Sequence, residues 1–102
     1  MTGIELIAKE RRRQIEQEGW TAEHDARHVN GELAQAASCY AFRSSLYVGN
    51  GSKYRTAGGG APSQWPWRKK WWKPKTVLRD LVRAGALIAA EIDRLLVEEA
   101  KR

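Results

Sequence analysis

Apolar residues recur at helical spacing in three segments of the chain, and this pattern predicts an all-α fold. The first helix is expected over residues 2–18, where Thr2 and Glu5 occupy the positions of a capping box and Gly19 can end the helix in a left-handed conformation. Ile4, Ile7, Ala8, Arg11 and Ile15 follow helical spacing in this segment, but the apolar stripe is thin and the arginines at positions 11–13 lie within it. We expect Trp20, which follows, to anchor the chain on the core.

A short second element is expected over residues 21–28, with Thr21 as its N-cap and Asn30-Gly31 after it. From Gly31 a longer helix is predicted to reach about Leu46. One side of that helix carries Leu33, Ala36, Ala37, Tyr40, Ala41 and Tyr47. Cys39 lies on the same helix among Ala and Ser neighbours, and we interpret it as a small buried hydrophobic residue.

The last helix is predicted from Pro74 and Thr76 to about Glu99 and has the broadest apolar face of the chain. This face consists of Leu78, Leu81, Val82, Leu87, Ile88, Ile92, Leu95 and Leu96. Small residues make the middle of the helix narrow, so neighbours are expected on several sides. Three helices of this size can barely provide them, and we therefore expect a homo-oligomer.

Residues 48–75 form a long loop with five glycines and three prolines, and such loops are usually functional or disordered. The first half looks flexible. The second half contains four tryptophans, which are costly to leave in water. The sequence thus predicts one domain over residues 1–102: a small bundle of three main helices and a short one, with a long Gly/Trp-rich loop.

Composition narrows the class of partner. The chain has 102 residues and one cysteine, which excludes an intramolecular disulfide and a multi-cysteine zinc site and favours the reducing cytoplasm. No apolar run approaches the ~18 residues of a membrane span, so no membrane partner is expected. The net charge is +6, and residues 68–75 (RKKWWKPK) alone carry five positive charges and no negative one. This excess favours an anionic ligand.

The tryptophan-lysine segment is the first candidate binding site, because aromatic faces stack on bases and cations neutralise phosphates. Its candidate ligand-binding residues are Trp65, Trp67, Arg68, Lys69, Lys70, Trp71, Trp72 and Lys73. Tyr54 and Arg55, earlier in the loop, are candidates for a lid. Alternatively, the tryptophans fill the core and the lysines only keep the surface soluble, or the cluster contacts a membrane surface or a protein.

The second candidate is His24, Asp25 and His28, which could hydrogen-bond a base or sugar while Arg11 and its neighbours hold phosphate. The spacing of the two histidines is also that of an H-E-x-x-H zinc site. Glu32 could then be a third ligand. Asp25 stands where that motif has glutamate, and its side chain is shorter. A third interpretation is that Glu23, His24 and Asp25 only cap the helix and pair with the arginines at positions 11–13.

Two resemblances add to this reading. The ordered segments ERRRQIEQEGWTAEHDARH, NGELAQAASCYA, WPWRKKWWKPK and DLVRAGALIAAEIDRL resemble a large group of small phage and prophage proteins, which implies a bacteriophage origin and the host cytoplasm. NGELAQA and DLVRAGALIAAEI resemble the metal-binding helices of MazG-type nucleotide pyrophosphohydrolases, which hold Mg²⁺ with E-x-x-E and E-x-x-D. Glu32 and Asp80 match the first acids, but Gln35 and Arg83 replace the second ones.

We therefore expect a phage protein that binds a nucleotide or cyclic oligonucleotide without turnover and without a cofactor. By analogy, it could sequester a cyclic nucleotide signal of bacterial immunity. The alternatives are a divergent Mg²⁺-dependent nucleotide pyrophosphohydrolase that uses Glu32, Asp80, Glu91 and Asp93, a non-specific nucleic-acid binder, and an inhibitor of a host protein.

Overall fold

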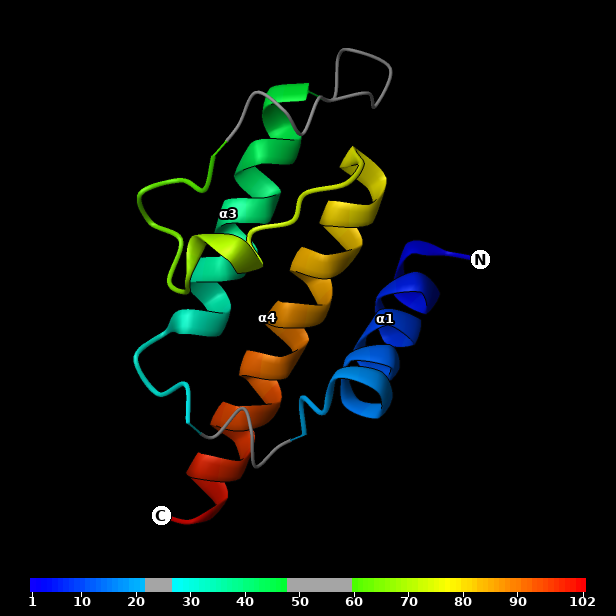
Figure 1. Cartoon of the computed structure of the whole chain (residues 1–102). Helices are drawn as coiled ribbons and strands as arrows, with labels where there is room; N and C mark the ends of the chain where they lie inside the picture. The colour runs from blue at the N-terminus through cyan, green and yellow to red at the C-terminus, as the bar shows by residue number, and fades with distance from the viewer. Residues whose placement is uncertain (22–26, 48–59) are drawn as a thin grey trace.

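The computed structural model describes residues 1–21, 27–47 and 60–102, and these residues form helices and loops without a strand. The helices are α1 (Gly3–Glu18), α3 (Glu32–Tyr47) and α4 (Val77–Ala100), with one short 3₁₀ turn, η3 (Lys69–Trp71), before α4 (Figure 1). The predicted all-α fold is confirmed. Most of the short element expected over residues 21–28 and the first half of the long loop lie outside the described residues.

The helix ends follow the chemistry of their capping residues. The Thr2 hydroxyl accepts a hydrogen bond from the Glu5 backbone N–H at 3.2 Å, and the Glu5 carboxylate accepts one from the Thr2 backbone N–H at 2.9 Å. Gly19 ends α1 with a φ of 72°, which costs glycine no steric clash. The Thr76 hydroxyl caps α4 by accepting from the Arg79 backbone N–H at 3.1 Å. The capping box and both boundaries agree with the prediction.

Helix α4 is the centre of the fold and contacts α3 on one side and α1 on the other (Figure 1). The core lies mainly between α3 and α4. It contains small and aliphatic residues of both helices together with aromatic rings from α3 and the loop: Leu33, Ala36, Ala37, Cys39, Tyr40, Trp65, Trp72, Ala84, Leu87 and Ala90. The expected buried side of α3 and the buried state of Cys39 are thus confirmed, and burial raises the pKa of the Cys39 thiol.

Helix α1 buries a face that only partly overlaps the one its apolar spacing predicts. Its fully buried residues are Glu10 and Gln14. Of the predicted stripe, Ile7 and Arg11 are half-buried, whereas Ile4 and Ile15 are exposed. The burial of Glu10 is possible because Arg13 and Arg79 neutralise its charge.

A glycine sets how closely α1 approaches α4. A Cβ atom placed on Gly85 would lie only 2.5 Å from the Cδ1 of Ile7, so the Ile7 side chain occupies the space that the missing side chain leaves. The predicted apolar face of α4 is only partly covered, because Val82 and Leu87 are buried while six residues stay exposed. These are Leu78, Leu81, Ile88, Ile92, Leu95 and Leu96. None of the helices among the described residues is both long and apolar enough to cross a membrane.

Candidate ligand-binding cleft

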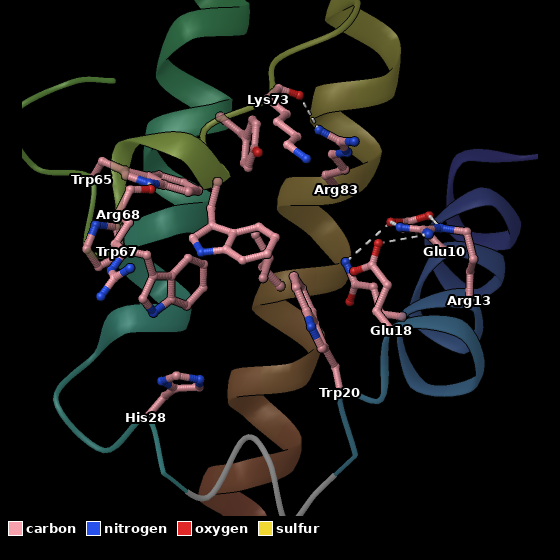
Figure 2. A pocket seen from close by; sticks show the side chains of 15 residues that line it. Glu10, Arg13, Glu18, Trp20, His28, Trp65, Trp67, Arg68, Lys73 and Arg83 are labelled. Atoms are coloured by element: carbon pink, nitrogen blue, oxygen red, sulfur yellow. Dashed lines mark hydrogen bonds and ion pairs between the residues drawn. The ribbon is translucent and has the colours of Figure 1, made fainter. Parts of the chain in front are cut away.

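A cleft of about 780 Å³ opens between α1 and the segment that precedes α4, and α4 forms its floor (Figure 2). Its lining combines aromatic rings, cations and acids. Glu10, Arg13, Gln14 and Glu18 come from α1, Trp20 and His28 from the chain that follows it, Tyr40 from α3, Trp65, Pro66, Trp67, Arg68, Trp71 and Lys73 from the loop, and Arg83 and Leu87 from α4.

Buried aromatic rings fix the loop segment on the core. The Tyr40 ring stacks on the Trp72 ring with centroids 4.8 Å apart, and Trp65 meets both rings edge-on at 5.5 Å and 4.9 Å. The indole N–H of Trp65 also donates to the Arg68 carbonyl at 3.1 Å, which closes the turn before η3. The segment therefore lies on a packed framework rather than extending into water.

Trp67 is half-buried and forms the centre of an aromatic wall of the cleft (Figure 2). Its ring contacts Trp65 edge-on at 5.4 Å, His28 at 5.5 Å and Trp20 at 6.4 Å, measured between centroids. Trp71 also lines the cleft but is 55% exposed. These rings present flat apolar surface to anything bound there.

Positive charge gathers at the end of the cleft away from His28, where Figure 2 shows Lys73 and Arg83 close together. The Arg83 guanidinium donates to the Lys73 carbonyl at 2.5 Å and lies 5.5 Å from the centroid of the Tyr40 ring. The Lys73 ammonium lies 5.5 Å from the centroid of the Trp71 ring. Arg68, beside Trp67, is exposed and lines the cleft as well. A bound anion would meet these cations next to the aromatic wall.

The α1 wall of the cleft carries charges that are already paired with one another. The Glu10 carboxylate accepts from Arg13 at 2.8 Å and 2.9 Å and from Arg79 at 2.5 Å, and Arg13 also pairs with Glu18 at 2.9 Å. Burial raises the pKa of Glu10, but the hydrogen bonds and charges of Arg13 and Arg79 outweigh burial and place it below its usual range. This wall is therefore close to neutral.

Four of the predicted ligand-binding residues lie outside the cleft. Trp72 is buried in the core, because its ring stacks on Tyr40. Lys69 and Lys70 belong to η3 and are exposed, and the Lys70 ammonium lies over the Trp71 ring at 5.1 Å. Arg11 donates to the Trp20 carbonyl at 3.2 Å and lies 3.8 Å from the Asp93 carboxylate, so it links α1 to its neighbours instead of contacting a ligand.

Trp65, Trp67, Arg68, Trp71, Lys73 and His28 are the predicted residues that the structure brings together at the cleft. Trp65 presents little of its surface to the cleft, since its side chain belongs to the core and the residue is only 9% exposed. The predictions for His24, Asp25, Tyr54 and Arg55 lie outside the described residues.

The acids of the alternative metal site are separated and each contacts other groups. Glu32 accepts from the Asn30 backbone N–H at 2.6 Å and lies 3.5 Å from His28. Asp80 is fully buried, where burial raises its pKa to about 6, and it accepts from the Lys75 backbone N–H at 3.1 Å. Glu91 pairs with Arg94 at 2.6 Å.

Glu91 lies eleven residues after Asp80 on the same helix, which is about 16 Å along the helix axis, so the two acids cannot share one ion. Within the described ranges, no group of three or more His, Cys, Asp or Glu side chains is placed to hold a metal ion.

Several lining residues could not be predicted from the sequence as part of a site. Trp20 packs against the core, as predicted, and lines the cleft as well. Tyr40, predicted only as an apolar residue of its helix, also lines the cleft. Arg83 shows no sequence signal that separates it from the other arginines, because its position at the cleft depends on how α4 is rotated. Comparisons with protein-family models, curated proteins and solved structures give no match for this chain.

Proposed function

We propose that the cleft binds a flat, anionic small molecule of the nucleotide class, cyclic oligonucleotides included, and holds it without turnover. One observation carries this proposal: the aromatic wall around Trp67 and the cations Lys73, Arg83 and Arg68 line the same cleft. A base or similar ring stacks on the indole surface, and the phosphates lie toward the cations.

The size of the cleft supports a small ligand. Its volume of about 780 Å³ lies within the range of about 300–1,000 Å³ that is usual for small-molecule sites. A nucleic acid strand would need a longer basic track, whereas Lys69 and Lys70 are exposed and do not line the cleft.

Binding without turnover fits the state of the acids at the cleft. Glu10 pairs with Arg13 and Arg79, and Glu18 pairs with Arg13, so the described acidic lining offers no pair of carboxylates for Mg²⁺. Together with the resemblance to phage proteins, this supports a protein that sequesters a nucleotide signal in the cytoplasm of a bacterial host.

Calorimetric titration with AMP, ATP and a cyclic dinucleotide tests the proposal. Trp67→Ala should weaken binding roughly 5- to 150-fold, because base–indole stacking contributes about 1–3 kcal/mol. Lys73→Ala should weaken binding and reduce its salt dependence. Lys69→Ala is the matched control outside the cleft and should bind as the wild type does. Chromatography of the ligand after incubation should recover it intact.

The proposal is wrong if none of these compounds binds, or if Lys69→Ala and Trp67→Ala behave alike. Single-stranded DNA of increasing length serves as a further arm. An affinity that rises steeply with length and falls steeply with salt would indicate a nucleic-acid binder instead. Release of pyrophosphate from ATP would indicate an enzyme.

A further inference from the structure

The outer face of α4 is an apolar surface that no described residue covers. Leu78, Leu81, Ile88, Ile92, Leu95 and Leu96 are between 43% and 62% exposed along this helix. A soluble protein rarely exposes so many large apolar side chains side by side unless they contact a partner. The ligand cleft lies on another side of α4, which contributes Arg83 and Leu87 to it.

The spacing of this face indicates that its partner is a helix. Leu78, Leu81, Ile88, Ile92 and Leu95 recur at steps of three, four and seven residues, which is the a/d spacing of a coiled-coil seam, and none of them is charged. The remaining a/d position is Gly85, on which Ile7 of α1 packs. A seam of this kind packs against a helix with the same repeat. We propose that a second copy of the chain supplies this helix, so that two α4 helices pair in an antiparallel dimer. The exposed apolar residues of α4 named above are called the α4 seam.

The charge distribution favours the antiparallel orientation. Residues 68–83, at the start of α4 and just before it, contain seven cations and one acid. Residues 91–102, at its other end, contain four acids and three cations. Antiparallel pairing places the strongly basic end of one copy beside the slightly acidic end of the other, whereas parallel pairing would place two strongly basic ends together.

The apolar area indicates a weak dimer. The exposed fractions of the six α4 side chains amount to about three fully exposed side chains. At about 60–120 Å² each, two copies would cover roughly 350–750 Å² of apolar surface. A specific interface of standard size buries about 1,200–2,000 Å² in total, and about two thirds of a homodimer interface is apolar, so this dimer is expected to form at high protein concentration.

The register follows from covering the whole exposed face. Ile88 lies midway between Leu81 and Leu95, so an antiparallel pair that covers this face has its two-fold axis close to Ile88 and sets the Leu81 end of one copy beside the Leu95 end of the other. Ile88→Glu therefore places two carboxylates opposite each other in the dimer. In the single chain the same substitution is tolerated, because Ile88 is half-exposed.

The mass in solution is measured by light scattering and by sedimentation over a wide range of protein concentration. The wild type should show twice the 11.6 kDa mass of the chain at high concentration, and Ile88→Glu should halve it while the helical circular dichroism stays unchanged. Phe42→Glu is the matched control, since Phe42 is exposed on α3 outside the α4 seam, and its mass should equal that of the wild type.

Disulfide trapping tests the orientation. In a Cys39→Ser background, Ile88→Cys should form a linked dimer on oxidation, whereas Leu95→Cys alone should not, because antiparallel pairing keeps two copies of that position apart. A mass of one chain at all concentrations, or a complex that Ile88→Glu leaves intact, overturns the proposal. Linkage through Leu95→Cys overturns the antiparallel orientation.

Discussion

The buried carboxylate of Glu10 ties α1 to α4, and replacing it measures how much that tie stabilises the fold. Its side chain is 1% exposed, and it accepts hydrogen bonds from Arg13, Gln14 and Arg79. Glu10→Gln keeps the shape of the side chain but removes its charge. The two arginines then lose their shared counter-ion beside the cleft.

The expected loss can be worked from burial. Breaking a buried ion pair by removing one partner costs about 3–5 kcal/mol. Here the side chains of Arg13 and Arg79 are 31% and 35% exposed, so water recovers part of the cost. We expect a loss of about 2–3 kcal/mol in the free energy of unfolding. This is a large part of the total of about 5–15 kcal/mol for a domain of this size and should lower Tm by roughly 10–20 °C.

Urea unfolding of Glu10→Gln should be compared with that of Glu18→Gln. Glu18 also pairs with Arg13, at 2.9 Å, but its side chain is 37% exposed, so its loss should cost less than about 1 kcal/mol. The two variants thus share a partner and differ in burial. Equal losses of stability in both variants would contradict the larger contribution of the buried carboxylate.

The pH dependence gives a second check on Glu10. Because its pKa in the folded chain lies below its ordinary value, its charge stabilises the fold above the unfolded pKa of about 4.3, and this contribution is lost as the pH falls through the folded pKa. The stability difference between the wild type and Glu10→Gln should therefore shrink below about pH 4. A difference that persists in strong acid would contradict this assignment.

Three further predictions concern packing and protonation. Trp72→Ala should lower the free energy of unfolding by about 3–5 kcal/mol, and Trp71→Ala by less than about 1 kcal/mol, in chemical denaturation; similar losses would contradict the burial of Trp72. Gly85→Ala should lower the free energy of unfolding, because the new methyl group clashes with Ile7, and Ile7→Ala should restore part of the loss. A double-mutant cycle in which the two substitutions are additive would contradict that contact. Burial raises the pKa of Asp80 to about 6, so the folded chain favours the protonated carboxyl. The free energy of unfolding of the wild type, measured relative to Asp80→Asn, should therefore fall by up to about 3 kcal/mol as the pH rises from about 4 to 7. Parallel stability curves for the two proteins over this pH range would contradict the raised pKa.

The helices could be predicted from the sequence because local chemistry determines them. The Thr2 capping box, the left-handed Gly19 and the Thr76 cap each depend on a few neighbouring residues, and the structure has all three. The buried face of α1 could not be predicted in this way. Glu10 is buried because Arg79, 69 residues further along the chain, lies beside it, and apolar spacing within α1 carries no information about that contact.

The candidate site could be predicted only as a segment. The clustering of tryptophans and cations before α4 identified one wall of the cleft, yet adjacent Trp71 and Trp72 point to different surroundings, one largely exposed and one buried. Which ring faces the cleft depends on the turn at η3 and on Tyr40, which the sequence does not place. Arg83 joins the cleft through tertiary packing alone.

The proposed function requires a flat anion to bind against Trp67 in the cleft. The indole N–H signals of the five tryptophans in a ¹H–¹⁵N spectrum report on such binding. On titration with a cyclic dinucleotide or ATP, the signals of Trp67 and Trp20 should shift in a saturable manner, while the signal of the core residue Trp72 stays in place. Absence of any shift, or a shift confined to the exposed Trp71, would contradict the account.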